Sequence, residues 1–517
     1  MRPECCGKPM SKGGGMAQSG RQRYRCTHRH GCGRSTTGSV DAIPDNPGYD
    51  QDLIDSNNER IRSSKKRRMI VTSAQNNTPL VSLFFKSLLI AAEHLDAELI
   101  IIPSHYKNTS LYSGRDEYQK SWSSDVQQYM IDDDIDIGCG YIIMGSIRIE
   151  APAMWPLSGL QPIGGELSTL FGHPQFAMEP VPTAGTDMPK RMWTTGSVTR
   201  KNYSRSVRGA KAEFNHISGA LLLELDRKNK WTHVRQLNSD SRGRFYDLDK
   251  QYTPDGVTTG HSISTLTTGD EHVSFIDPTV VKSTYTGKHS ITSTLQPRYI
   301  IRHDVMDGYA GSHHHMHDDV KSYRKFVEGT NDYRRELDGV VRHLNKTTPD
   351  FATNIFPASN HDDHLDKWLN KVDPRKDHTN ATLIHELKLM QYTAEVQTPA
   401  LQLYLSDKLT CKCQFVSDRH PWVVGGVDYS QHGHVGVKGA RGSARAFANT
   451  TSRMTIGHSH TARIVKGVYQ TGKSCGPLEY ERGLSDTSNT HVIQYKSGKR
   501  SIIDIQPNGD YKLPDKW

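Results

Sequence analysis

The chain has 517 residues, of which 35% are hydrophobic and 23% are charged. It is too long for one ordinary hydrophobic core, and its composition is that of a folded globular protein rather than a disordered one. It contains no run of about 18 apolar residues, so we expect no membrane-spanning helix.

The net charge of +9 is concentrated near the N-terminus, where residues 1–40 contain eight lysines and arginines and one acidic residue. A basic module joined to a near-neutral body is typical of proteins that bind nucleic acid, although a solvated basic tail is the alternative. The first residues lack the apolar core of a secretory signal, so we expect a cytoplasmic protein. In that compartment the eight cysteines are more often metal ligands or thiols than disulfides.

Residues 1–39 have almost no aliphatic side chains and need another means of stabilisation. Three cysteines in this segment can ligate one zinc ion: Cys6, Cys26 and Cys32. The fourth ligand is Cys5, His28 or His30, and we take Cys5; the alternative is that these cysteines are reactive or idle thiols. The basic stretch Gly20–Cys26 resembles zinc ribbons of DNA-binding proteins associated with transposases, which implies a small N-terminal zinc ribbon with structural zinc.

Residues 40–67 are polar and end in a basic cluster, which predicts a linker. A folded region then begins, for which the pattern predicts a strand over 69–72, a helix over 79–95 and a strand over 97–102. Such a β-α-β unit favours a parallel sheet. We read 68–255 as a mixed α/β domain of unassigned role, with further short strands at Tyr141–Met144 and Ala220–Leu225.

Residues 256–517 form a third predicted domain, the catalytic one. Of the 26 histidines, 19 lie after residue 256, and this enrichment indicates metal or acid–base chemistry. A helix is predicted over Asp319–Leu344. The predicted strands are Ile263–Thr268, Arg298–Arg302, Phe351–Phe356, Trp422–Asp428 and Ser452–Ile456.

Five short motifs follow one another in this domain, and most lie next to a predicted strand. They are Gly269–His272, His303–Asp307, Ser359–Asp362, His432–His434 and Gly457–His460. Their carboxylate, amide and imidazole groups are sufficient to ligate two neighbouring divalent metal ions. Two such ions can clamp a phosphoryl group and lower the pKa of a shared water. Each motif alone is most often a turn, and it is their ordered combination that predicts a dimetal site.

In this order the motifs resemble those of the calcineurin-like metallophosphoesterases, over about residues 256–490. The resemblance implies an α/β (α+β) fold in which two β-sheets form a sandwich flanked by helices, with the ligands on loops after strands. It implies two catalytic residues, Asp304 as the bridge between the ions and His361 as an acid or a stabiliser of the transition state. The other implied ligands are Asp270, His272 and His460 for one ion, and Asn360, His432 and His458 for the other.

The chain departs from the family pattern at His303 and Ser359, where the family usually has glycine. Neither position supplies a ligand, so the metal site is not put in doubt. His434 competes with His432 for the fourth motif, and we prefer His432. The long segment before it contains two weaker candidates, His385 and His420. The histidines of segment 313–317 are either further ligands or phosphate contacts, or an exposed loop.

A metallophosphoesterase joined to a ribbon looks most like bacteriophage DNA-degrading enzymes, distantly similar to the SbcD-type repair nucleases. The resemblance therefore implies a metal-dependent nuclease that hydrolyses DNA, in the host cytoplasm if it is phage-encoded. We expect manganese in the site, with iron or zinc as alternatives. The alternatives in function are a phosphomonoesterase or small-nucleotide phosphodiesterase, and a non-catalytic zinc-ribbon DNA-binding or assembly protein. Nothing in the sequence fixes a stoichiometry, and a homo-oligomer stays open.

Overall fold

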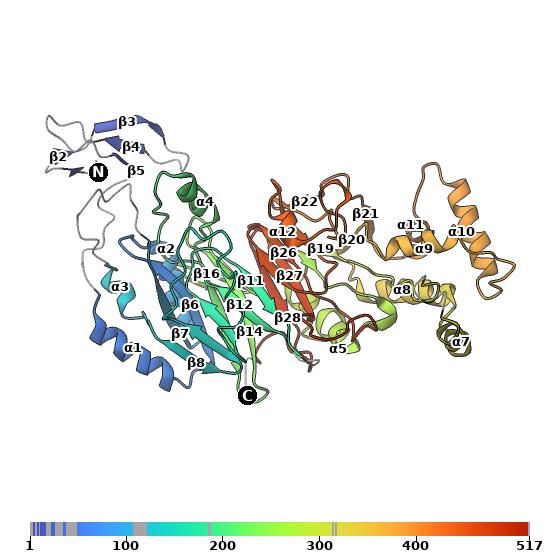
Figure 1. The fold of residues 1–517 in the computed structure, drawn as a ribbon, viewed down its shortest axis with the longest axis horizontal. Helices are drawn as coiled ribbons and strands as arrows, with labels where there is room; N and C mark the ends of the chain where they lie inside the picture. The colour runs from blue at the N-terminus through green and yellow to red at the C-terminus, as the bar shows by residue number, and fades with distance from the viewer. Residues whose placement is uncertain are drawn as a thin grey trace. The chain divides into compact units, whose positions relative to one another are not determined.

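The computed structural model describes residues 4–5, 8–9, 11–16, 22–25, 35–37, 49–106, 121–184, 188–312, 315 and 318–514. The chain divides into two compact units, each of mixed α/β structure (Figure 1). Unit 1 comprises Met1–Met178 and Arg191–Thr258, and unit 2 comprises Glu179–Lys190 and Thr259–Trp517. Within the described ranges, no helix has the length and hydrophobicity that a bilayer-spanning segment requires.

The described residues of the N-terminal segment form five short strands. Strand β1 (Glu4–Cys5) pairs antiparallel with β2 (Lys8–Pro9), and β3 (Ser11–Met16), β4 (Gln22–Arg25) and β5 (Ser35–Thr37) form an antiparallel sheet. The predicted zinc ligands Cys6, Cys26 and Cys32 lie outside the described residues, and for Cys5 only the backbone is described. The zinc ribbon therefore stays a prediction.

Helix α1 (Gln51–Ser63) lies within residues 40–67, for which the sequence predicts a linker, so that prediction is wrong for this part. The side chain of Asp50 caps the helix by accepting a hydrogen bond from the Leu53 amide at 3.1 Å. Ile54 is fully buried, and the Asn57 amide donates to the Gln127 carbonyl at 2.9 Å. The helix is mostly polar because only one narrow stripe of it packs against unit 1.

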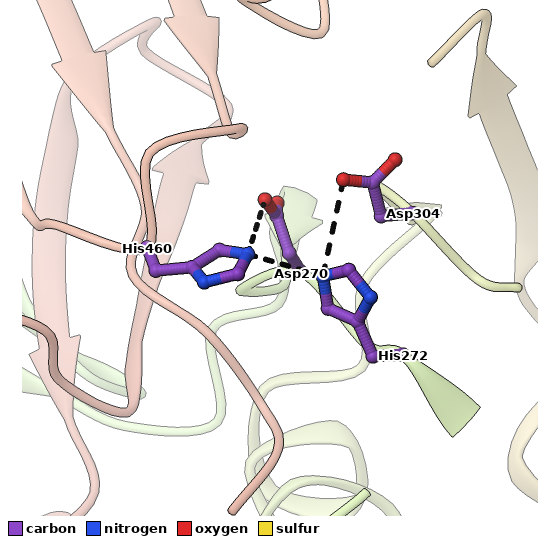
Figure 2. A group of neighbouring side chains, drawn as sticks. All are labelled: Asp270, His272, Asp304 and His460. Atoms are coloured by element: carbon purple, nitrogen blue, oxygen red, sulfur yellow. Dashed lines mark hydrogen bonds and ion pairs between the residues drawn. The ribbon is translucent and has the colours of Figure 1, made fainter. Parts of the chain in front are cut away.

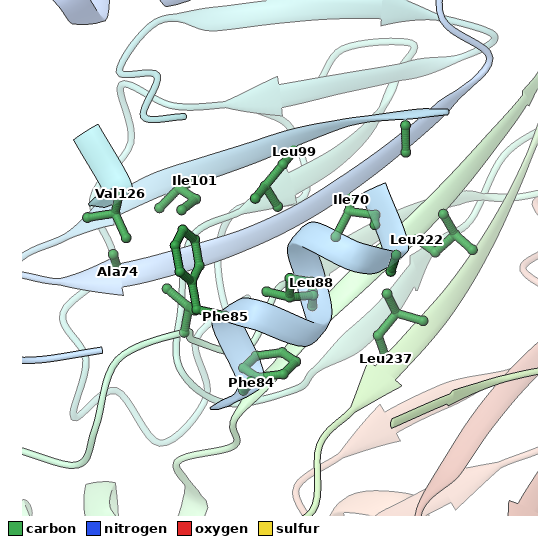
Figure 3. Packing of buried hydrophobic residues seen from close by; sticks show 14 of the residues in the cluster. Ile70, Ala74, Phe84, Phe85, Leu88, Leu99, Ile101, Val126, Leu222 and Leu237 are labelled. Atoms are coloured by element: carbon green, nitrogen blue, oxygen red, sulfur yellow. The ribbon is translucent and has the colours of Figure 1, made fainter. Parts of the chain in front are cut away.

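The predicted β-α-β unit is confirmed in unit 1. Strand β6 (Arg68–Gln75) runs parallel to β7 (Ala97–Ser104), and α2 (Ser82–His94) connects them. The sheet continues antiparallel through β13 (Gly219–Asp226) and β14 (Trp231–Asn238), so it is mixed rather than purely parallel. The apolar face of α2, including Phe84, Phe85 and Leu88, packs on this sheet against residues such as Ile70, Leu99 and Leu222 (Figure 3).

A second set of strands in unit 1 has the order β8-β9-β10-β12, in which β9, β10 and β12 are parallel. Its members are β8 (Asp134–Gly138), β9 (Tyr141–Met144), β10 (Ser168–Phe171) and β12 (Lys190–Thr194). The remaining elements of unit 1 are α3 (Ser124–Gln127), α4 (Val207–Asn215) and the antiparallel β15 (Phe245–Asp247), β16 (Lys250–Thr253) and β17 (Gly256–Thr258). Strand β11 (Met178–Val181) falls mostly in the Glu179–Lys190 segment of unit 2.

Unit 2 contains a six-stranded sheet of order β21-β20-β19-β18-β27-β28. Four of its strands are parallel: β18 (Ile263–Thr267), β19 (Tyr299–Ile301), β20 (Thr353–Pro357) and β21 (Cys413–Val416). Strands β27 (Thr490–Tyr495) and β28 (Arg500–Asp504) complete it antiparallel. Because the carboxyl ends of parallel strands meet at one edge, the loops after β18, β19 and β20 start close together.

A second group of strands in unit 2 packs against this sheet. It consists of β22 (Val423–Val424), β23 (Val427–Asp428), β24 (Arg453–Ile456), β25 (Arg463–Val465) and β26 (Val468–Gln470). Ile301 and Ile355 of the six-stranded sheet share one buried cluster with Val427 and Tyr429. The predicted strand Trp422–Asp428 is instead the β22–β23 hairpin, because Gly425 and Gly426 adopt positive φ angles of 55° and 76°.

The helices of unit 2 connect its strands along the chain. The predicted helix Asp319–Leu344 is two helices, α7 (Asp319–Glu328) and α8 (Tyr333–Thr347), because Gly329 ends the first at φ 66° and Asp332 caps the second. The others are α5 (Pro278–Val281), α6 (Ile291–Leu295), α9 (Asp362–Leu369), α10 (Ala381–Thr393), α11 (Ala400–Lys408) and α12 (Ala444–Phe447). Short 3₁₀ turns occupy Val273–Phe275 and Val437–Gly439, and a π turn Lys282–Thr286.

Candidate metal centre

The five motifs lie on loops that leave the carboxyl ends of strands. Asp270 and His272 follow β18, Asp304 follows β19, and Asn360 lies between β20 and α9. From the second group of strands, His432 follows β23, and the loop after β24 carries His458 and His460. Both groups of strands therefore present polar side chains at one place in unit 2.

Backbone hydrogen bonds hold these loops side by side. The His272 amide donates to the Asp304 carbonyl at 2.8 Å, and the Gly457 amide donates to the His432 carbonyl at 2.7 Å. The His458 amide donates to Oδ2 of Asp270 at 2.8 Å, which ties the two groups of strands together. Gly457 is needed here, because a Cβ atom at this position would lie 2.3 Å from Oδ1 of Asp270.

Four of the candidate ligands have left-handed backbone conformations. The φ angles are 39° for His272, 44° for Asp304, 77° for His458 and 56° for His460. Residues other than glycine rarely adopt such φ angles, and each residue that does so costs on the order of 1 kcal/mol or more in conformational energy. Strained backbone that gathers at one buried point is typical of a functional site.

The seven predicted ligands meet in two groups (Figure 2 shows the first), and His272 also forms a further cluster with Asp307 and His361. In the first group, Nε2 of His460 lies 3.5 Å from Oδ2 of Asp270, and Nε2 of His272 lies 3.9 Å from Oδ2 of Asp304. In the second, Nε2 of His432 lies 3.1 Å from Oδ2 of Asp304 and 3.1 Å from Oδ1 of Asn360, and His458 completes the group. The two groups share Asp304.

The contacts inside the first group are those of ligands around a cation. Nε2 of His272 and Nε2 of His460 lie only 3.0 Å apart, although at most one of two neutral imidazoles can donate a proton there. Oδ1 of Asp270 is buried and has no hydrogen-bond partner among the described residues. Buried oxygen and nitrogen acceptors directed at one another need a proton or a metal ion between them. These buried histidines and aspartates could therefore hold a metal ion.

The outer nitrogens of three histidines have partners that direct Nε2 inward. Nδ1 of His272 lies 3.0 Å from Oδ2 of Asp307, and Nδ1 of His460 lies 3.1 Å from Oε1 of Glu481. Nδ1 of His432 lies 3.2 Å from Nδ1 of His303. In metal sites, the ligating histidine usually donates its other N–H to such a partner, which fixes the tautomer and the ring orientation.

The protonation states of the candidate ligands follow from burial and from the charges around them. Burial opposes a charge on His432, but Asp304 outweighs it and raises the pKa of His432 to about 9. Burial and the charge of His432 lower the pKa of His303 to about 3 and that of His458 to about 4. His303 is thus neutral, and its Nδ1 accepts a hydrogen bond from the Nδ1–H group of His432.

The two central carboxyl groups differ. Burial raises the pKa of Asp270 above its ordinary value. Burial acts in the same direction on Asp304, but its histidine neighbours, His432 and His361, hold its pKa well below the usual range. Asp304, the residue common to both groups, therefore carries the more stable negative charge.

His361 lies beside these groups and is not directed like the other histidines. Its Nδ1 lies 2.7 Å from the Asp307 carbonyl oxygen, to which it donates, so its Nε2 is the nitrogen left for a bound molecule. Its ring packs edge-on against His272 with the centroids 4.5 Å apart. His361 begins α9, which ties its position to that helix.

A fully buried ion pair supports the loops from behind. Nη1 of Arg302 donates to Oε1 of Glu271 at 2.8 Å, and Nε of Arg302 donates to Oδ1 of Asn354 at 2.8 Å. Burial alone would raise the pKa of Glu271, but the Arg302 guanidinium and His343 hold it far below its usual range. Because Glu271 lies between Asp270 and His272, and Arg302 two residues before Asp304, this pair fixes the first group of ligands.

The structure brings together all seven predicted metal ligands and His361. His434 is half-buried beside His432 but belongs to neither group of ligand atoms. His385 and His420 are exposed and lie apart from the centre, and within segment 313–317 only His315 is described. Sequence reasoning missed the roles of Asp307, Glu481 and His303. Asp307 could have been found, because it lies within the motif His303–Asp307. Glu481 lies in none of the motifs, and no sequence signal marks it.

Comparison with known proteins gives one extensive similarity. Over 478 residues the chain is 30% identical to protein A1 of Escherichia phage T5, an alignment that covers 89% of this chain and 85% of that protein. No family model matches the chain, and no solved structure matches it.

Proposed function

The chain belongs to the family of protein A1 of Escherichia phage T5, and we propose that it is a metal-dependent phosphodiesterase that hydrolyses DNA. The observation that carries this proposal is the buried centre in which two groups of ligand atoms share Asp304. Hydrolysis of phosphate esters is one of the reactions that two-metal centres with such ligands catalyse.

Two divalent ions are part of this proposal. Asp270, His272 and His460 would hold one ion, and Asn360, His432 and His458 the other, with Asp304 between them. Manganese suits this donor set, with iron and zinc as alternatives. When bound, such ions polarise a phosphoryl oxygen and lower the pKa of a water. The proposal includes the two-sheet sandwich of metallophosphoesterases, which the contact between the two strand groups of unit 2 supports.

His361 would act on the substrate rather than on the metal. Its Nδ1 is engaged by the Asp307 carbonyl, so its Nε2 is the nitrogen that could donate a proton to, or hydrogen-bond, the leaving oxygen. Replacement by alanine should then lower kcat by about 100-fold or more while the protein keeps its metal. An equal loss of metal in the variant would mean that His361 is a ligand.

DNA is proposed as the substrate on the basis of charge. The first 40 residues carry most of the net positive charge, together with cysteines suited to zinc, and arginine and lysine side chains bind backbone phosphates without reading sequence. The host cytoplasm is the compartment in which a phage protein of this kind would meet DNA.

The test is metal analysis of the purified protein, followed by digestion of plasmid DNA with chelator and with added manganese. We expect release of acid-soluble fragments that needs the metal and that Asp304→Asn abolishes. Hydrolysis of small chromogenic phosphates without digestion of DNA would instead support a phosphomonoesterase or small-nucleotide phosphodiesterase. DNA binding without turnover of either substrate, with metal content unchanged in Asp304→Asn, would support a non-catalytic protein.

A further inference from the structure

A cavity of about 600 Å³ lies in unit 2 among the helices that follow the metal-binding loops. Its volume falls in the range of about 300–1,000 Å³ that is usual for small-molecule sites. Its walls combine basic and aromatic side chains, which include Lys325, His364, Lys367, Trp368, Lys371 and Lys376.

The cavity adjoins the metal centre through two continuous segments. The chain that supplies Asp304 continues to Ala310, Gly311 and Ser312 in the cavity wall, and the chain that supplies Asn360 continues into α9. Nδ1 of His364 lies 3.4 Å from the Asp307 carbonyl, and the rings of His364 and His361 are 4.6 Å apart between centroids. One side chain thus separates the cavity from His361.

The wall nearest the metal centre is held in place by packing and hydrogen bonds. The partly buried carboxylate of Glu336 accepts hydrogen bonds from the amides of Gly308 at 2.7 Å and Ala310 at 3.0 Å. The Trp368 ring packs on Tyr333 with centroids 4.3 Å apart. A Cβ atom on Gly311 would lie 2.4 Å from the Tyr333 ring, so the loop approaches these aromatic rings closely.

Two of the four lysines that line the cavity have no ion-pair partner among the described residues. Lys371 and Lys376 are exposed and form no ion pair within the part of the chain that the structure describes. Lys367 lies 3.7 Å from Asp363, a distance at which an exposed pair contributes little. The lining carboxylate Asp377 accepts hydrogen bonds from the backbone and side-chain amides of Asn380 at 3.1 and 3.0 Å, at the start of α10.

We infer that this cavity receives the nucleotide next to the cleaved phosphate of a DNA strand, with Lys371 and Lys376 binding backbone phosphates and Trp368 contacting a base. The inference rests on the proposed function. Basic grooves with aromatic walls bind single strands in this way, with little dependence on sequence. The same lysines beside a metal centre would orient the strand toward His361.

The test is binding of a fluorescent single-stranded oligonucleotide to the whole protein in chelator, measured at several salt concentrations. Lys371→Ala with Lys376→Ala should lower affinity about tenfold or more and reduce the slope of log affinity against log salt by about 1.4, the value for two phosphate contacts to a single strand. Trp368→Leu should lower affinity about tenfold, and Trp368→Phe should retain most of it. The matched control is Lys346→Ala with Lys496→Ala, two exposed lysines outside the cavity lining.

A second measurement follows hydrolysis of bis(p-nitrophenyl) phosphate with manganese, because this diester is too short to extend into the cavity. The lysine variants should hydrolyse it at the wild-type rate and keep their metal content, while their KM for DNA rises. The inference is overturned if the cavity variants bind the oligonucleotide like the wild type, or if the control pair loses as much affinity. Failure of the proposed function would appear separately, as a wild-type protein that cuts no DNA with manganese.

Discussion

Among the described residues, Arg302 is the only arginine or lysine within hydrogen-bond distance of the buried carboxylate of Glu271. The imidazole of His343 also lies close, with Nε2 at 3.2 Å from Oε2. Replacing Arg302 by methionine keeps the volume but leaves a buried carboxylate without its strong counter-charge. We expect Arg302→Met to lower the free energy of unfolding by about 3–5 kcal/mol. Urea denaturation of the metal-free protein measures this.

The control for that prediction is Arg298→Met, which removes an exposed guanidinium four residues earlier, where its main contact is the Tyr299 ring. Its effect should stay within about 0.5 kcal/mol. Equal stabilities of the two variants would show that the Arg302–Glu271 pair does not support the fold.

Lys325 makes the free energy of unfolding depend on pH. Burial lowers its pKa from 10.5 to about 8, against the opposing effect of Glu336, Asp307 and Glu479. Between pH 8 and 10.5 the unfolded chain therefore binds more protons at this residue than the folded one, so stability should rise with pH. From pH 7.5 to 9.5 in chelator we expect a gain of about 1–2 kcal/mol in the free energy of unfolding.

Lys325→Met, which has no charge to titrate, isolates this contribution. From pH 7.5 to 9.5, the free energy of unfolding of this variant should rise less than that of the wild type. The difference between the two rises is the contribution of Lys325. The same pH profile in both proteins would contradict the depressed pKa.

Among the structural elements, the loop after β24 depends on one glycine. Gly457→Ala would place a methyl group 2.3 Å from Oδ1 of Asp270, so the loop must shift or Asp270 must turn. We expect at least a tenfold loss of manganese affinity, with the circular dichroism of the folded protein retained. Gly339→Ala in α8 is the control, because its added Cβ meets only the end of Arg342, 3.9 Å away, and metal affinity should not change.

The elements that the sequence predicted well are those with local signals. The apolar runs of β6 and β7 and the helical spacing between them were sufficient for the β-α-β unit, and the motif order was sufficient to gather the ligands. The single helix over Asp319–Leu344 was wrong because the apolar spacing continues past Gly329, where the backbone turns left-handed. The predicted linker over 40–67 was wrong in part, because a few apolar residues are sufficient to hold a helix against a folded unit.

The residues that support the ligands could not be predicted in the same way. Glu481 reaches His460 from a loop 21 positions away, and no periodicity links the two. His303 stands where the metallophosphoesterases that the motifs resemble usually have glycine, and its contact with His432 joins the two groups of strands. Partners of this kind are chosen by the three-dimensional arrangement, which chain order does not reveal.

At the scale of the whole molecule, metal binding should be coupled to stability. A ligand that binds only the folded state at 1,000 times its Kd stabilises by about 4 kcal/mol. We therefore expect manganese to raise the Tm of the chelator-treated protein by on the order of 4 °C, measured by calorimetry. Asp304→Asn serves as the control, and a full shift in that variant would place the stabilising metal elsewhere.

The strand order of unit 2 also bears on when the protein becomes active. Strand β18, whose loop carries Asp270 and His272, has β27 as one neighbour, and β27 is made almost last. A polypeptide still emerging from the ribosome lacks this strand, and until late in translation it also lacks His460 and Glu481. If the chain degrades DNA, its nascent and prematurely terminated forms would lack part of the metal centre and would leave the DNA of the producing cell intact.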